Sequence, residues 1–106
     1  MTRDWLKIIK KRIEERNSGV FYSEKKYWVK FESLEEDRAI AWIQANKKSL
    51  RLFLKLDYNI YNDLNESPCT QNWGKSFPSV YKISSAEQIN RAIELILESY
   101  FNDLNN

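Results

Sequence analysis

The chain has 106 residues, the length of one domain, with 42% apolar and 30% charged residues, which indicates a folded chain rather than a disordered one. Its net charge of +2 permits nucleic-acid binding without arguing for it. It contains no histidine, which excludes Ser-His and Cys-His nucleophile pairs within the chain and removes the commonest metal ligand. The one cysteine, Cys69, excludes an internal disulfide framework.

The expected location is the cytoplasm. The first residues are charged and lack the apolar core of a secretory signal, and no apolar run reaches the ~18 residues of a membrane span. A single cysteine agrees with a reducing compartment. We therefore expect no membrane partner.

The first half of the chain predicts a helix followed by three strands. Residues 2–16 have helical spacing of Trp5, Ile8, Ile9 and Ile13. Residues 26–32, 38–45 and 50–56 alternate as strands do, with short polar turns between them, which predicts an antiparallel meander. The leucines at alternate positions of residues 50–56 should face the core.

The second half predicts a long loop at residues 57–78, a strand at residues 79–83 and a helix at residues 85–101. Ser84 and Ser85 are alternative N-caps, since each fits the spacing of a capping box. The expected fold class is therefore α+β. One domain over residues 1–106 holds an antiparallel sheet of four to five strands with a helix at each end, in the order α-β-β-β-β-α.

Three stretches carry a family likeness: LRLFLKLD at residues 50–57, NWGK at residues 72–75, and YKISSAEQ at residues 81–88 with the helix that follows it through Ser99-Tyr100. In this order they resemble an uncharacterised bacterial domain family labelled "predicted transport protein". Members of that family often carry a histidine before the Trp-Gly pair, where this chain has Asn72. The chain is more weakly similar to the YjbR and MmcQ proteins. That similarity implies a curved antiparallel sheet packed with helices, and some of those proteins have been discussed as nucleic-acid binders. Neither resemblance implies an established activity.

One face of the predicted sheet combines aromatic and basic side chains. Strand alternation places the following candidate binding residues on it: Trp28, Lys30, Trp42, Arg51 and Lys55. Interleaved aromatics and cations are typical of a surface that stacks the bases of single-stranded nucleic acid. The alternative is structural, because Trp28, Trp42 and Phe53 would be core if the second helix covered this face.

The predicted loop holds a second group of candidates, namely Tyr61, Trp73 and Lys75. Carboxylates beside tyrosines can do acid-base chemistry, so an enzyme using Asp57, Asp63 and Tyr61 is one hypothesis. A solvated loop attached to the body by its aromatic side chains is the structural alternative.

The sequence favours a non-enzymatic binding module, with no catalytic residue, cofactor or metal centre expected. Nucleic acid is the first candidate partner. The alternative is another protein, bound through the same aromatic surface in a heteromeric complex or a homodimer.

Overall fold

The structure, a computed structural model, describes residues 2–16, 19–25, 28–33, 38–67 and 77–104. The elements follow the chain in this order: α1 (Thr2–Arg16), β1 (Val20–Lys25), β2 (Trp28–Ser33), β3 (Arg38–Ala45), β4 (Leu50–Leu54), β5 (Asn65–Glu66), β6 (Ser79–Ile83), the 3-10 turn η1 (Ala86–Gln88) and α3 (Ile89–Leu104). This order confirms the α+β class with a helix at each end.

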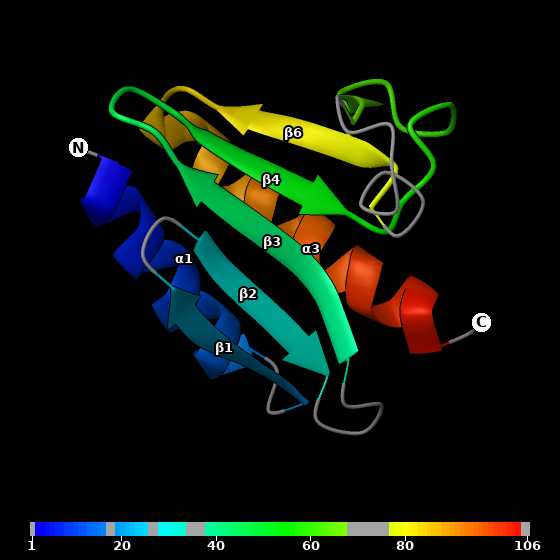
Figure 1. The fold of residues 1–106 in the computed structure, drawn as a ribbon, viewed down its shortest axis with the longest axis horizontal. Helices are drawn as coiled ribbons and strands as arrows, with labels where there is room; N and C mark the ends of the chain where they lie inside the picture. The colour runs from blue at the N-terminus through cyan, green and yellow to red at the C-terminus, as the bar shows by residue number, and fades with distance from the viewer. Residues whose placement is uncertain (1, 17–18, 26–27, 34–37, 68–76, 105–106) are drawn as a thin grey trace.

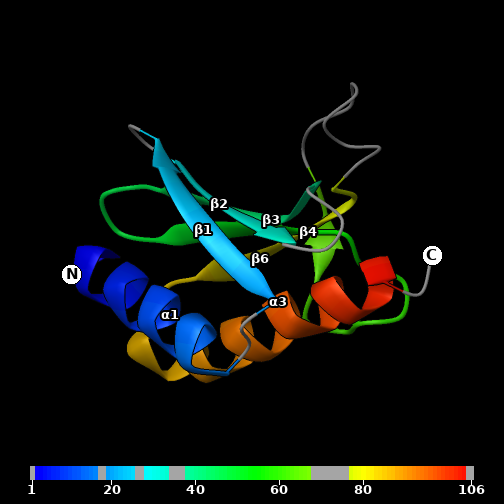
Figure 2. The same ribbon diagram turned by 90° about the horizontal axis from the view of Figure 1, so that it is seen from below.

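The strands form one antiparallel sheet in the order β1-β2-β3-β4-β6-β5. Figure 2 shows α1 and α3 together on one side of this sheet. Figure 1 looks onto the opposite side, where no labelled element lies in front of the strands. We call this side the helix-free face. The two layers explain the strand alternation. Successive side chains of a strand point to opposite faces of the sheet, so every second side chain meets the helices and the others do not.

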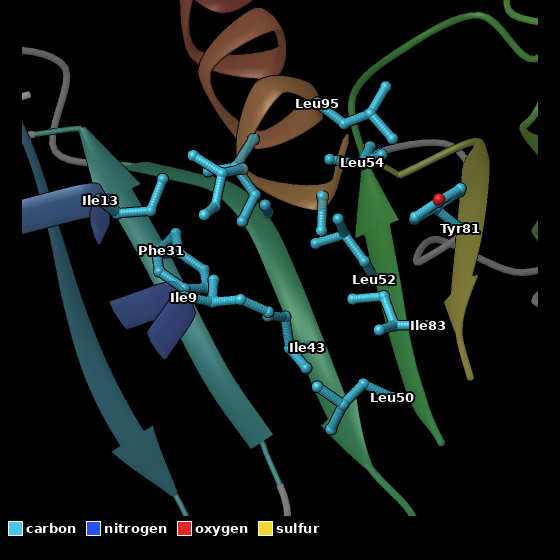
Figure 3. Close-up of a cluster of buried hydrophobic side chains, with 14 of the residues drawn as sticks. Ile9, Ile13, Phe31, Ile43, Leu50, Leu52, Leu54, Tyr81, Ile83 and Leu95 are labelled. Atoms are coloured by element: carbon cyan, nitrogen blue, oxygen red, sulfur yellow. The ribbon is translucent and has the colours of Figure 1, made fainter. Parts of the chain in front are cut away.

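The core lies between the helices and the sheet (Figure 3). Leu50, Leu52 and Leu54 of β4 are fully buried there, and Leu56 is 4% exposed, as the leucine alternation predicts. Paired across the strands with these leucines are Ala45, Ile43 and Ala41 of β3, followed by Val29 and Phe31 of β2. Trp5, Ile9 and Ile13 of α1 close this layer, together with Ile89, Ala92, Ile93, Leu95, Ile96 and Tyr100 of α3.

A register irregularity in β3 overturns one detail of the predicted alternation. Phe31 pairs with Ala41 while the next residue, Glu32, pairs with Ala39, so Ile40 is an extra residue between them. A bulge turns two successive side chains toward one face. Ile40 and Ala41 are consequently both fully buried, whereas strict alternation predicts Ile40 beside Trp42.

Two strands are missing from the sequence-based prediction. β1 has no clear alternation in Val-Phe-Tyr-Ser-Glu-Lys, because it is an edge strand whose helix side is partly exposed. The two-residue β5 lies inside the predicted loop at residues 57–78, held against β6 by its pairing and by the Ser67 N–H, which donates to the Pro78 carbonyl at 2.8 Å. Among the described residues the sheet therefore has six strands, where four to five were expected.

Several element ends also shift. The predicted strand at residues 26–32 corresponds to β2 (Trp28–Ser33), which continues one residue further, while residues 26–27 lie outside the described ranges. The predicted strand at residues 50–56 ends at Leu54, and the bounds of β3 and β6 match the prediction. The predicted helix at residues 85–101 is η1 followed by α3, which continues to Leu104. Ser85 is its N-cap, with the Gln88 side chain accepting the Ser85 N–H at 3.2 Å, so the second of the two capping-box alternatives holds. α1 has the predicted bounds, but Ile8 is 37% exposed and faces away from the core.

Candidate nucleic-acid interface

Two cross-strand rows of side chains on the helix-free face contain predicted binding residues. Antiparallel register places residues directly opposite one another on neighbouring strands, with side chains on the same face. The first row consists of Trp28, Gln44, Arg51 and Lys82. The second row consists of Ser23, Lys30, Trp42, Phe53, Val80 and Asn65. The sheet thus brings together four of the five predicted binding residues: Trp28, Lys30, Trp42 and Arg51.

An aromatic cluster occupies the centre of these rows. The ring of Trp28 lies 5.8 Å from that of Trp42 in an edge-to-face arrangement and 5.8 Å from that of Phe53. Phe53 is 1% exposed, whereas both indoles are half-buried. Phe53 is therefore the buried member of the cluster, and the two tryptophans retain surface that solvent can reach.

The alternative in which the second helix covers these aromatics is wrong. Both helices pack on the leucine side of the sheet, as Figure 2 shows. A sheet with one covered face normally carries polar residues on the other. Aromatic side chains on the helix-free face of this sheet therefore call for an explanation other than packing against α3.

Cations lie against the aromatic rings. Lys30 Nζ is 5.6 Å from the ring centroid of Trp42, and the Arg51 guanidinium carbon is 5.4 Å from that of Phe53. Lys30 also forms an ion pair with Glu32 at 3.5 Å. Arg51 is hydrogen-bonded to the side-chain oxygen of Gln44 and has no ion-pair partner among the described residues. Positive charge on this face is thus only partly neutralised.

Lys55, the fifth predicted binding residue, lies apart from this cluster. β4 ends at Leu54, so alternation no longer governs the direction of the next side chain. Lys55 Nζ forms a 3.2 Å ion pair with Asp103 of α3, a residue only 7% exposed, and lies 5.7 Å from the ring of Phe77. Its contacts attach the end of α3 to the sheet.

The loop candidates divide between described and undescribed residues. Trp73, Lys75 and also Cys69 lie outside the described ranges. Tyr61 is half-buried and packs against the core, and this burial raises the pKa of its hydroxyl, with a further contribution from the carboxylate of Glu98. A raised pKa keeps the Tyr61 phenol protonated, which does not favour it as a base.

The carboxylates of the enzyme hypothesis have structural partners. Asp63 accepts from Nε and Nη2 of Arg91 at 2.6 and 3.2 Å, and this contact lowers the pKa of the carboxyl. Asp57 accepts the N–H of Asn59 at 2.9 Å, which stabilises the turn after β4. Sequence reasoning missed Arg91 because its partner is 28 residues away along the chain. The local signal for Arg91 in the sequence was Glu94 three residues later, which is the spacing of an ion pair on one face of a helix.

Within the described ranges, no cluster of three or more acidic or cysteine side chains is placed to hold a metal ion. Nor is any helix in those ranges long and apolar enough to cross a membrane.

Comparisons with protein-family models, with curated proteins and with solved structures find no match to this chain.

Proposed function

We propose that this chain binds single-stranded nucleic acid on the helix-free face of its sheet. The observation that carries the proposal is the pair of half-buried indoles, Trp28 and Trp42, on a sheet face that neither helix covers. Lys30 lies against Trp42, and Arg51 lies against the neighbouring Phe53.

The chemistry of the face suits unpaired bases. Each base has a π-face that can stack on an indole whatever its identity, while lysine and arginine meet the phosphates. Bases in a duplex are already stacked and paired, so they cannot stack on side chains without being pulled out. A single strand is therefore the favoured ligand.

The charge of the face supports the same ligand. Among the described strand residues on the helix-free face, Glu32 is the acidic one, and it is engaged by Lys30. Arg51 and the exposed Lys82 have no carboxylate within ion-pair distance among the described residues. Lys47 and Lys48, both exposed, lie in the turn that joins β3 to β4, next to the row that contains Arg51. This end of the sheet is therefore positively charged although the net charge of the chain is only +2.

The test is fluorescence anisotropy with labelled oligo-dT and oligo-U at low salt, beside a duplex of the same length. We expect binding to the single strands that weakens as salt rises, because phosphate neutralisation releases counterions. Trp28→Ala should reduce affinity by about 1–3 kcal/mol, the range for losing one stacked base. Lys82→Ala should reduce the salt slope by about one unit. Lys11→Ala, on the exposed side of α1, is the matched control and should change neither quantity.

Each variant must first show the native melting temperature within a few degrees, since a half-buried tryptophan also contributes to stability. Absence of binding to any single strand at tens of micromolar would refute the proposal. Concentration-dependent dimerisation that Trp28→Ala abolishes would then favour the alternative, a protein-binding surface.

We also propose a cytoplasmic location, which suits a chain with one cysteine and a nucleic-acid ligand.

A further inference from the structure

We infer that Arg51 and Gln44 together recognise a pair of adjacent hydrogen-bond acceptors on a base, and that guanine is the base they select. This inference rests on the proposed function and assigns a specificity to the same face. Arg51 makes two hydrogen bonds to a single acceptor. Both Nε and Nη2 of Arg51 donate to one atom, Oε1 of Gln44, at 3.0 and 2.6 Å.

These two bonds occupy one edge of the guanidinium and leave another available. Arginine has five N–H donors in a planar fork. Among the described residues no hydrogen-bond partner lies at Nη1, so the end of the fork, Nη1 with the remaining hydrogen of Nη2, can donate two parallel bonds. Such a fork matches two acceptors side by side.

The guanidinium is also held in place before any ligand binds. Gln44 and Arg51 are directly opposite each other on β3 and β4, so the backbone register sets their separation. The ring of Phe53, itself buried, lies 5.4 Å from the guanidinium carbon. A side chain already restricted in this way loses less conformational entropy on binding, which makes its contacts more selective.

Gln44 extends the same donor pattern. Its carbonyl oxygen already accepts twice from Arg51, so the part of the side chain left for a ligand is the NH₂ group. The Gln44–Arg51 pair therefore presents donors only. Guanine carries the acceptors O6 and N7 next to each other, whereas adenine has a donor at N6 beside its N7. In thymine and uracil the N3–H separates the two carbonyl oxygens.

The position of Trp28 makes this contact geometrically reasonable. Phe53 lies 5.8 Å from the Trp28 ring and 5.4 Å from the Arg51 guanidinium, so the indole and the guanidinium lie near the same phenyl ring. A base stacked on Trp28 with one edge toward Phe53 would therefore be close to Arg51. A purine offers the larger stacking area, which favours guanine over cytosine, whose N3 and O2 are also adjacent acceptors.

The experiment uses a labelled dT twelve-mer with one central substitution: deoxyguanosine, deoxyinosine, 7-deaza-deoxyguanosine, deoxyadenosine or deoxycytidine. Guanine and inosine both keep O6 and N7. We expect them to bind at least about five-fold more tightly than adenine and 7-deazaguanine, the lower limit for a bidentate contact. Equal affinity for cytosine and guanine would overturn the choice of guanine.

Two variants separate base recognition from charge. Arg51→Lys keeps the charge but lacks the fork, so it should abolish the preference for guanine over adenine and leave most of the affinity for oligo-dT. Lys82→Ala, in the same cross-strand row, should weaken all oligonucleotides alike and leave the preference intact.

The outcomes are distinguishable. If the native protein binds oligo-dT but shows no preference among the substitutions, the guanine inference is wrong while the proposed function stands. If Arg51→Lys weakens every oligonucleotide equally and keeps the preference, Arg51 contacts phosphate and the inference is again wrong. If nothing binds, both fall together.

Discussion

The hydroxyl of Ser99 in α3 donates a 2.7 Å hydrogen bond to the backbone carbonyl of Ile40 in β3. Ile40 is the bulge residue of that strand, and the same hydroxyl accepts the N–H of Lys55 at 3.0 Å just beyond β4. One buried side chain thus satisfies a backbone carbonyl of β3 and the backbone N–H of the residue that follows β4. This contact helps hold α3 on the leucine side of the sheet, the side opposite Trp28 and Trp42.

Replacing Ser99 with alanine should destabilise the fold. The change leaves a buried carbonyl and an N–H without their partner, which costs about 1–3 kcal/mol. Urea denaturation followed by tryptophan fluorescence measures the free energy of unfolding. Ser84→Ala, at an exposed position before η1, is the control and should stay within about 0.5 kcal/mol of the native chain. Equal stability of the two variants would contradict the structural role of Ser99.

The second stability prediction concerns the core residue Leu54. Its side chain is fully buried between β4 and the helix layer (Figure 3), so Leu54→Ala should reduce the free energy of unfolding by about 2–5 kcal/mol. Ile60 is 72% exposed and offers a matched apolar control. Ile60→Ala should have an effect of less than about 0.5 kcal/mol. A loss below about 1 kcal/mol for Leu54→Ala would mean that the faces of β4 are assigned backwards.

Lys55→Met should affect stability more than ligand binding. The substitution removes the ion pair with Asp103, a side chain only 7% exposed, so about 1–3 kcal/mol of stability should be lost. Because Lys55 is engaged by α3, the salt slope of oligo-dT binding should remain that of the native protein. A slope reduced by about one unit would instead show that Lys55 contacts a phosphate.

The Arg91–Asp63 pair predicts a dependence of stability on pH. Arg91 lowers the pKa of Asp63 below its ordinary value of 3.8, so the pair stabilises the fold above about pH 4. That contribution disappears as the pH falls through the lowered pKa. Both side chains are about one-third exposed, which limits the effect to below about 1 kcal/mol.

Urea denaturation of Asp63→Asn at pH 7 and at progressively lower pH measures this contribution. The variant should be less stable than the native chain at neutral pH and approach it in acid. Glu15→Gln, at an exposed position of α1, controls for the change in net charge. A difference between Asp63→Asn and the native chain that grew as the pH fell would contradict the assignment.

Local pattern alone was sufficient for much of the fold. The alternate leucines at Leu50, Leu52 and Leu54 and the apolar stripe through Ile89 and Ile93 locate the core, because burial imposes a period of two on a strand and 3.6 on a helix. The same patterns determined the α+β class, the order of the terminal helices and the bounds of β3 and β6. β1 and β5 escaped prediction, since an edge strand and a two-residue strand carry too little burial to impose a period.

Tertiary structure decided the rest. Alternation in β2, β3 and β4 divides the side chains into two faces, but both faces contain large apolar residues, so it does not say which face the helices cover. The packing of α1 and α3 on the same side settled that question and left Trp28 and Trp42 half-buried on the other. Lys55 follows the alternation in sequence yet turns to Asp103, because the strand ends one residue earlier and an ion-pair partner 48 residues away is brought close only by folding.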